Sequence, residues 1–295
     1  VVETPDGQRR ICHPRGKKSQ AVVGDHVLWQ AAPAGQGDEG TIEKVQERRN
    51  LFYRQDEIRT KSFAANIDQV LILIAAEPVF SESQLARALI TAEATHITPL
   101  IALNKSDLVE PFARAWERLQ PYRHMGAEGK HYGVLPLSLT QSSDVDRNAL
   151  MEHLKGKTTL VLGPSGSGKS TLINLLVPGA SVLTGEISQA LNSGKHTTTS
   201  THWYWMDAER TTALIDSPGF QEFGLHHIAP MQLASCMPDI AAHASDCRFY
   251  NCTHLHEPGC GVLDALKKPT EQGGISATRY KIYSDLFAEL SQPRY

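Results

Sequence analysis

The sequence lacks an apolar run long enough to cross a lipid bilayer. Its longest such run covers only residues 70–76, whereas a membrane-spanning helix needs about 20 consecutive apolar residues. We therefore expect no membrane partner and interpret this run as a buried parallel strand. Internal repeats and low-complexity tracts are also absent from the sequence, which argues against a solenoid or a disordered chain.

Neither sign of charge dominates the composition. The 29 Lys and Arg residues nearly balance the 32 Asp and Glu residues, for a net charge of −3. This balance argues against a protein that coats polyanions, so any contact with nucleic acid must come from local basic patches. The length of 295 residues allows two or three domains, and a hydrophobic content of 41% is enough for ordinary globular cores.

Cysteine is scarce, with 5 residues in the chain. No signal peptide opens the sequence, so nothing indicates the oxidising compartment in which disulfides persist. Cys12 and Cys236 stand apart from the others, and we interpret them as small apolar residues. The sequence does not begin with Met, and we expect that it starts inside a longer native protein.

A glycine-rich phosphate loop, G-P-S-G-S-G-K-S, covers residues 163–170. The residues before it predict a strand, and those after it predict an apolar helix that Pro178 ends. The glycines let backbone N–H groups surround a phosphate beside the positive end of that helix. Lys169 would reach the β- and γ-phosphates, and Ser170 would bind Mg²⁺. The residues predicted to bind nucleotide here are Gly163, Pro164, Ser165, Gly166, Ser167, Gly168, Lys169, Ser170 and Thr171.

A second loop, D-S-P-G at residues 216–219, comes directly after another predicted strand. Asp216 can hold Mg²⁺ through water, and Gly219 can donate its backbone N–H to a γ-phosphate. Between the two loops lies the polar segment G-K-H-T-T-T, residues 194–199. It suits a switch loop in which Thr198 reaches the metal, although its threonines also fit the start of an exposed strand.

The tetrapeptide N-K-S-D follows the apolar run 99–103. We therefore expect it at the carboxyl end of a strand, where α/β sheets bind ligands. Asp107 can accept hydrogen bonds from the guanine N1–H and exocyclic amine, a pair of donors that adenine does not present. Asn104 can serve the O6 and N7 edge, and the stem of Lys105 can lie over the ring. The residues predicted to bind guanine are Asn104, Lys105, Ser106 and Asp107.

The order of these motifs is unusual, because N-K-S-D precedes the phosphate loop instead of following it. This order predicts an α/β fold with a circularly permuted P-loop GTPase domain that uses Mg²⁺ with GTP or GDP. Permutation can preserve one sheet and one pocket because domain termini often lie close together. Ser138, after the strand-like residues 133–137, is a weaker candidate for a second base-binding loop.

Cysteine and histidine gather near the C-terminus in the pattern C-x4-C-x-H-x5-C, residues 247–260. Three sulfurs and an imidazole in a turn-rich stretch fit a closed, tetrahedral, structural Zn²⁺ site. The spacing leaves His254 and His256 as rival ligands, and a disulfide or separately buried thiols remain alternatives. The spacing of apolar residues over 280–290 then predicts a terminal helix.

The first 57 residues have a different pattern. Runs 9–13, 21–29 and 40–48 are strand-like and are separated by glycine-rich turns. We predict a small β-barrel of the five-stranded oligonucleotide-binding (OB) type. Its basic residues form either a solvated face or a phosphate-binding surface. They are Arg9, Arg10, Arg15, Lys17 and Lys18 at its beginning, and Arg48, Arg49, Arg54, Arg59 and Lys61 at its exit.

In combination, these features resemble the RsgA/YjeQ family of bacterial GTPases that depend on the small ribosomal subunit. The resemblance rests on a β-barrel followed by N-K-x-D, G-x-S-G-x-G-K-S, H-T-T-T, D-S-P-G and C-x4-C-x-H-x5-C, and it covers essentially the whole chain. It predicts an OB-type β-barrel over residues 1–57, a permuted GTPase domain over 58–228, and a zinc-binding module with a C-terminal helix over 229–295.

The resemblance also implies a function. The expected protein is cytoplasmic, binds the small ribosomal subunit and its rRNA, assists late maturation, and hydrolyses GTP faster when docked there. We expect it to be a monomer. The alternative is a GTP-dependent protein-interaction switch that holds a protein partner without RNA contact. The resemblance further implies one structural zinc ion on Cys247, Cys252, His254 and Cys260.

The residue after D-S-P-G departs from commoner GTPases. Many carry a Gln there that orients the attacking water, whereas this chain has Phe220. Catalysis therefore needs another water-positioning group or a partner. His196 is our candidate, and members of the resembling family carry a His at this place. The alternative is a surface switch residue without a catalytic role.

Overall fold

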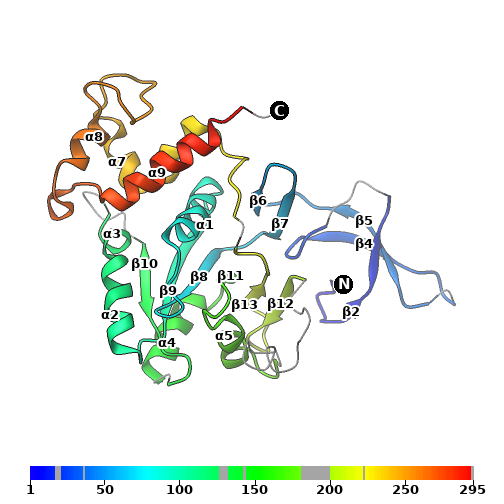
Figure 1. Cartoon of the computed structure of the whole chain (residues 1–295). Helices are drawn as coiled ribbons and strands as arrows, with labels where there is room; N and C mark the ends of the chain where they lie inside the picture. The colour runs from blue at the N-terminus through cyan, green and yellow to red at the C-terminus, as the bar shows by residue number, and fades with distance from the viewer. Residues whose placement is uncertain are drawn as a thin grey trace, which may run out of the picture.

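A computed structural model describes residues 1–16, 21–35, 37–125, 132–141, 144–180, 200–221 and 223–293. In Figure 1 the central sheet and its helices lie between two smaller parts. The N-terminal strands stand on one side of the sheet, and the C-terminal helices α7, α8 and α9 stand on the other.

The molecule is organised around a six-stranded sheet with the order β10-β9-β8-β11-β13-β12. Neighbouring strands run parallel, except that β12 pairs antiparallel with β13 at one edge. The carboxyl ends of β9, β11 and β13 therefore meet at one edge of the sheet, where the three predicted nucleotide-binding loops begin. The strands are β8 (Gln69–Ala75), β9 (Thr98–Asn104), β10 (Gly133–Pro136), β11 (Thr158–Leu162), β12 (His202–Trp205) and β13 (Ala213–Asp216).

The central strand β8 confirms the prediction of a buried parallel strand, because every one of its residues is buried. Val70, Ile72 and Ile74 enter one hydrophobic core. Leu71 and Leu73 enter another. Successive side chains of a strand point to opposite faces, so a strand covered on both sides needs an unbroken apolar run.

Helices cover both faces of this sheet. Residues of α1, α2 and α3 belong to the core that holds Val70. Those of α4 and α5 belong to the core that holds Leu71. The helices are α1 (Glu82–Ala94), α2 (Val109–Arg118), α3 (Gln120–Arg123), α4 (Asp144–Leu154) and α5 (Lys169–Leu176).

The N-terminal strands belong to three small sheets within the described residues: the pair β1-β2, the sheet β3-β5-β4 and the hairpin β6-β7. These assignments do not join five strands into one closed barrel in that part of the chain, and the OB-type barrel stays a prediction. The strands are β1 (Val2–Glu3), β2 (Arg9–Arg10), β3 (Cys12–Pro14), β4 (Val27–Ala31), β5 (Gly40–Val45), β6 (Leu51–Gln55) and β7 (Thr60–Ala65).

One predicted strand was wrong in extent. The run 21–29 is not a single strand, because β4 begins only at Val27. Gly24 interrupts the run with a left-handed φ of +92°. A Cβ at this position would lie 2.1 Å from the carbonyl oxygen of Ala65 on β7. Glycine is therefore required here, both for the φ value and for the close approach to β7.

The C-terminal helices share a core with the sheet. Leu233, Cys252 and Tyr283 belong to the same hydrophobic core as Val70 and the residues of α1. The predicted terminal helix over 280–290 is confirmed within α9. The elements of this part are η1 (Pro230–Cys236), α7 (Pro238–Ala244), α8 (Gly261–Leu266), η2 (Thr270–Gln272) and α9 (Ala277–Leu290).

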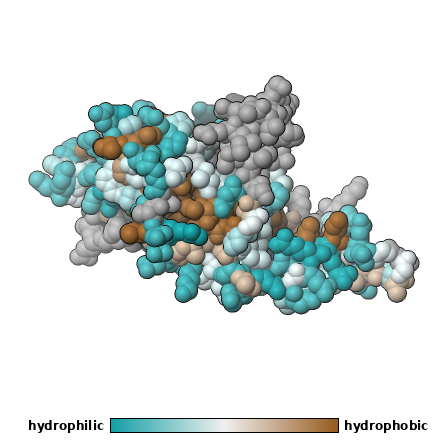
Figure 2. Space-filling model, turned by 90° about the horizontal axis from the view of Figure 1, so that it is seen from below, coloured by the Kyte–Doolittle hydropathy of each residue, from teal (hydrophilic) through white to brown (hydrophobic). Residues whose placement is uncertain are grey.

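The surface seen from below the view of Figure 1 is largely hydrophilic, and hydrophobic residues gather near the middle of that face (Figure 2). Among the described helices, none combines the length and the apolar character that crossing a membrane requires.

A buried ion pair joins α9 to α7 and reaches the GTPase part of the chain. Arg279 donates from Nε and Nη2 to the two carboxylate oxygens of Asp239, at 2.9 and 2.8 Å. The guanidinium also lies over the ring of Tyr122 on α3, 4.9 Å from its centroid. The Arg279 side chain is only 2% exposed. Removing one partner of such a pair leaves an uncompensated buried charge.

We expect Arg279→Met to lower the free energy of unfolding by about 3–5 kcal/mol, because Asp239 stays buried without its cation. Urea unfolding measures the change. Lys281→Met is the matched control on the same helix, since Lys281 pairs with Asp285 at the exposed surface. That control should change the unfolding free energy by no more than about 0.5 kcal/mol. An Arg279→Met loss as small as that of the control would contradict the role of this pair.

Candidate functional site

The phosphate loop connects β11 to α5 as predicted. Gly166 and Gly168 take left-handed φ values of +80° and +100°, and Gly168 is the N-cap of α5. Ser165 and Gly166 are exposed at the tip of the loop, whereas Ser167 is buried. Ser170 and Thr171 are half-buried in the first turn of α5. Backbone N–H groups at such a helix N-terminus can bind an anion.

Asn104 ties the N-K-S-D loop to the phosphate loop. Its Nδ2 donates to the backbone carbonyl of Ser167 at 2.9 Å. Its Oδ1 accepts from the backbone N–H groups of Lys105 at 2.7 Å and Leu139 at 3.1 Å. A Cβ on Gly168 would lie 2.4 Å from Asn104 Nδ2, so this contact requires glycine in the phosphate loop. One buried side chain thus holds three loops together.

Ser138, the weaker candidate for base binding, lies beside the N-K-S-D loop. Ser138 Oγ donates to Asp107 Oδ1 at 2.7 Å, and Ser138 is buried. The hydroxyl fixes one carboxylate oxygen and leaves the other available to accept hydrogen bonds. Lys105 takes a left-handed φ of 70°, which turns the chain between Asn104 and Asp107. The structure therefore brings together the two segments that were predicted to bind the base and that lie apart in the sequence.

The phosphate-loop lysine contacts the D-S-P-G loop. Lys169 Nζ donates to Asp216 Oδ1, and to the backbone carbonyl of Ser217 at 3.2 Å. Asp216 lies at the carboxyl end of β13 and is 2% exposed. A cation and a carboxylate therefore meet between the two loops that were predicted to hold phosphate and Mg²⁺.

A lysine that the sequence analysis assigned to the barrel exit also reaches this loop. Lys61 on β7 donates from Nζ to the backbone carbonyl of Pro218. A Cβ on Gly219 would lie 2.7 Å from the same Nζ. Burial first, and then the positive charges of Arg54 and Lys169, lower the pKa of Lys61. No motif signalled this contact, because it joins residues that are far apart in the chain.

Phe220, next in the chain, is buried and packs near Phe223, with ring centroids 6.3 Å apart. Its side chain has no polar atom that could form a hydrogen bond at the loop. His196 and Thr198 lie outside the described residues, as does the rest of the 194–199 segment. Thr201, which follows that segment, contacts the D-S-P-G loop through its hydroxyl, 2.9 Å from Ser217 Oγ.

Other predicted basic residues are engaged in ion pairs. Arg48 donates to Asp25, whose side chain is 1% exposed, and Arg49 donates to Asp68 at 2.9 Å. Arg9 and Arg15 pair with glutamates in the N-terminal sheets. Lys17 and Lys18 lie outside the described residues. Arg54 lies 3.8 Å from Asp56, Arg10 lies over the ring of Trp29, and Arg59 is exposed.

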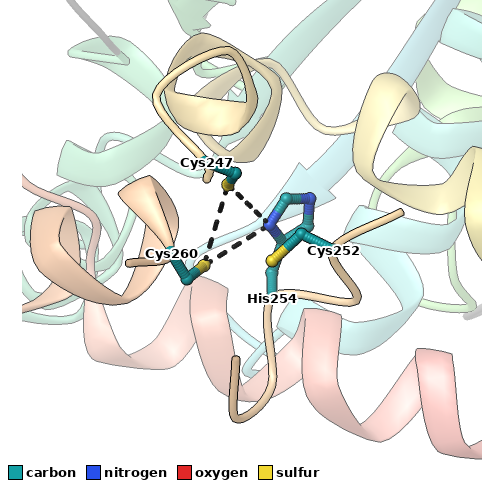
Figure 3. A group of neighbouring side chains, drawn as sticks. All are labelled: Cys247, Cys252, His254 and Cys260. Atoms are coloured by element: carbon teal, nitrogen blue, oxygen red, sulfur yellow. Dashed lines mark hydrogen bonds between the residues drawn. The ribbon is translucent and has the colours of Figure 1, made fainter. Parts of the chain in front are cut away.

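The predicted metal ligands converge in the C-terminal part (Figure 3). One ligand atom from each of Cys247, Cys252, His254 and Cys260 lies within 4.8 Å of all the others. Cys260 caps α8, and the loop that holds Cys252 and His254 lies against α9. His254 is buried, whereas its rival His256 is exposed. All five cysteines are free, so a disulfide is not formed.

The ligand atoms of Cys247, His254 and Cys260 are spaced as a tetrahedral metal site requires. Cys247 Sγ lies 3.4 Å from His254 Nδ1 and 3.9 Å from Cys260 Sγ, and Cys260 Sγ lies 3.5 Å from the same nitrogen. Ordinary Zn–S and Zn–N bond lengths give tetrahedral edges of about 3.8 Å between sulfurs and about 3.6 Å between sulfur and nitrogen. The donor set of four ligands, and the spacing of Cys247, His254 and Cys260 within it, therefore fit Zn²⁺.

Burial acts in opposite directions on the two kinds of ligand in this cluster, favouring the metal-binding form of the imidazole but disfavouring that of the thiols. Burial lowers the pKa of His254, which favours the neutral imidazole that binds metal. Burial raises the pKa of Cys252 to about 12, and the neighbouring thiols add to this effect. Several thiolates at this spacing repel one another, so a bound cation is what would allow them to lose their protons together.

A polar clamp holds the metal-ligand loop in shape. The Glu257 carboxylate accepts hydrogen bonds from Thr253, including its backbone N–H at 2.8 Å, and from Leu255 N–H at 3.2 Å. From α9, Tyr280 donates its hydroxyl to the carbonyl of His254 at 2.9 Å, and Tyr283 donates to that of Thr253 at 2.8 Å. The loop thus depends on α9 as well as on its own turns.

Sequence comparison gives strong matches over the whole chain. The family model described as RsgA GTPase matches residues 45–226. A protein from Variovorax paradoxus named small ribosomal subunit biogenesis GTPase RsgA is 75% identical over 295 residues, which cover 100% of this chain and 90% of that relative. A protein of the same name from Paraburkholderia xenovorans is 50% identical over 296 residues, with coverages of 99% and 90%.

Solved structures agree with the sequence matches. YjeQ from Thermotoga maritima is 29% identical, with a TM-score of 0.73 over 98% of this chain and 93% of that one. YloQ, described as a circularly permuted GTPase, is also 29% identical, with a TM-score of 0.70 over 99% of this chain and 91% of that one. The chain therefore belongs to the RsgA GTPase family, and the predicted circular permutation is confirmed.

Proposed function

We propose that this protein binds GTP with Mg²⁺ at the carboxyl edge of its central sheet, hydrolyses it to GDP and phosphate, and thereby assists late maturation of the small ribosomal subunit. One observation carries the nucleotide site: the hydrogen bond from Asn104 Nδ2 to the Ser167 carbonyl joins the N-K-S-D loop to the phosphate loop. A guanine and a phosphate chain can bind together only if these two loops are adjacent.

Base recognition falls to Asp107 and Ser138. The Asp107 carboxylate, oriented by the Ser138 hydroxyl, accepts from guanine N1–H and the exocyclic amine. Asn104 uses one amide N–H on Ser167, so the other remains for the O6 and N7 edge. Lys105 and Ser106 complete this loop. A base without matching donors leaves a desolvated carboxylate unpaired, which disfavours adenine.

The phosphate side uses the loop from Gly163 to Thr171. Its backbone N–H groups and Lys169 hold the phosphate oxygens, Ser170 and Thr198 bind Mg²⁺, and Gly219 donates to the γ-phosphate. The bond between Lys169 and Asp216 supports this arrangement, because the two charged groups of the site already lie together. When bound, Mg²⁺ neutralises charge that develops on the phosphates.

The ribosomal part of the proposal rests on the names of the relatives, which are small ribosomal subunit biogenesis GTPases. We propose that the chain binds the small subunit and its rRNA in the cytoplasm as a monomer without a membrane partner. We further propose the domain boundaries 1–57, 58–228 and 229–295. GTP turnover measured with and without purified small subunits tests this role. A turnover rate that does not change when subunits are added would contradict it.

For guanine recognition, we expect Asp107→Asn to weaken GTP binding by about 10–100-fold and to gain binding of xanthosine triphosphate. The expected loss of binding free energy is the cost of leaving one buried polar group unsatisfied, about 1–3 kcal/mol. The new amide can donate a hydrogen bond to the carbonyl that xanthine carries. Titration with both nucleotides measures the exchange. Asp285→Asn on the exposed face of α9 is the control and should bind GTP normally. GTP affinity that is unchanged in Asp107→Asn rejects the assignment.

For the metal site, we expect about one zinc ion per wild-type chain and its loss in Cys252→Ser, because a closed site depends on all four ligands. The loop over 247–260 should become sensitive to protease, while GTP binding persists because α5, the helix that follows the phosphate loop, packs in the other core. Metal analysis and limited proteolysis provide the measurement. Cys236→Ser, a buried thiol outside the cluster, should keep its zinc. Wild-type protein purified without chelators yet free of zinc would refute the site.

For catalysis, we expect slow hydrolysis by the isolated chain and a marked rise on small subunits. His196→Ala should lose most of that rise, about a hundredfold or more for a proton-handling or water-positioning group, while it binds GTP almost normally. Lys169→Ala should instead weaken nucleotide binding itself. Steady-state turnover and GTP titration of the three proteins measure these effects. Full stimulation of His196→Ala by subunits means that His196 has no catalytic role.

A further inference from the structure

The hairpin β6-β7 places two cations opposite each other. Arg54 and Lys61 are direct cross-strand partners in its antiparallel register. Partners of this kind project from the same face of the hairpin, and like charges at such positions destabilise it. The hairpin therefore carries an electrostatic cost that an anion would remove.

Arg54 has little within the protein to offset its charge. Its side chain is 13% exposed, and its closest carboxylate contact is with Asp56, at 3.8 Å. Within the described residues, Nε and Nη1 are buried and have no hydrogen-bond partner. Buried polar groups of this kind are ordinarily satisfied, so this pair of nitrogens indicates a partner outside the described residues, and a bound anion would provide one.

Lys61 extends from the same hairpin to the D-S-P-G loop. Its ammonium lies over the ring of Phe63, 5.2 Å from the centroid, and donates to the carbonyl of Pro218. A carbonyl is a neutral acceptor, so it does not balance the charge of Lys61. The nearness of Nζ to Gly219 puts the ammonium beside the glycine that is proposed to contact the γ-phosphate.

Lys169 approaches this loop from the phosphate-loop side, through Asp216 and the carbonyl of Ser217. Two lysines, Lys61 and Lys169, thus contact the loop, and Arg54 is the cross-strand neighbour of Lys61. Asp216 is the carboxylate that pairs with Lys169. The effect of the Lys169 charge on the pKa of Lys61 agrees with this closeness. A site with excess positive charge between a phosphate loop and a D-S-P-G loop suits the terminal phosphate of a nucleotide.

We propose that Lys61 is a catalytic residue that donates a hydrogen bond from Nζ to the γ-phosphate of GTP, with Arg54 behind it adding to the positive potential. This inference rests on the proposed GTP site. Lys61 exchanges the neutral Pro218 carbonyl for a charged phosphate oxygen, which is the stronger hydrogen bond. It supplies from within the chain the positive charge that other GTPases obtain from an arginine finger.

In the reaction, the oxygen of a water molecule forms a bond to the γ-phosphorus. The bond from that phosphorus to the β–γ bridging oxygen breaks, and GDP leaves with the electron pair. The water proton passes to the released phosphate, so the products are GDP and inorganic phosphate. Lys61 keeps all its protons and stabilises the negative charge on the γ-phosphate oxygens as the bond breaks.

The test compares Lys61→Met, which removes the charge at similar length, with Lys61→Arg, which keeps it. Lys44→Met is the matched control, because Lys44 lies exposed on β5. We would measure affinities for GTP and GDP and the single-turnover rate of GTP hydrolysis by the full chain, without subunits.

We expect Lys61→Met to bind GDP like the wild type and to bind GTP about tenfold more weakly. It should hydrolyse bound GTP about 10–100-fold more slowly, because it has lost one charge-assisted hydrogen bond to the γ-phosphate. Lys61→Arg should recover most of both losses, and Lys44→Met should match the wild type. A purely structural role would weaken GTP and GDP binding alike, and that result, or an unchanged rate, overturns the proposal. If the wild type binds neither nucleotide, the proposed function itself has failed.

Discussion

The nucleotide site depends on one buried amide. Asn104 donates to the phosphate loop through Ser167 and accepts from the loop that carries Ser138, through Leu139 N–H. These segments follow different strands, and the amide contacts both of them, while the bond from Ser138 to Asp107 adds a second link between the two base-side loops. Because a buried polar side chain must satisfy its hydrogen bonds, any shift of one loop would leave an unpaired group. The three loops of the proposed GTP site are therefore held in place by contacts within the protein itself.

Charge is the second constraint on this region. Lys169 is neutralised by Asp216, whereas the hydrogen bond of Lys61 goes to a neutral carbonyl of the same loop. Two buried nitrogens of Arg54 have no hydrogen-bond partner among the described residues. This excess of positive charge lowers the stability of the ligand-free protein and favours the binding of an anion with several negatively charged oxygens. The hairpin β6-β7 thus connects the N-terminal strands to the loop that is proposed to sense the nucleotide.

The C-terminal part packs into the same hydrophobic core as the central sheet. Cys252 and Cys260 share a core with the central sheet, and Arg279 lies between Asp239 and Tyr122. Metal binding, the loop clamp at Glu257 and the packing of α9 therefore support one another. A rigid connection of this kind can transmit a change at the nucleotide site because packed cores do not deform continuously.

The nucleotide motifs, their permuted order, the buried strand β8 and the pattern of three cysteines with two candidate histidines could be recognised from the sequence, because each depends on local spacing or on an unbroken apolar run. Spacing could not separate His254 from His256; family resemblance favoured His254, and burial distinguishes the two. The break of the run 21–29 at Gly24 could not be predicted from the sequence, since its reason is the carbonyl of Ala65, which β7 brings close in the folded chain. Likewise Lys61 looked like one more basic residue at the barrel exit, and its contact with Pro218 joins positions 157 residues apart. Contacts of that separation arise from the packing of elements and leave no periodic signal in the chain.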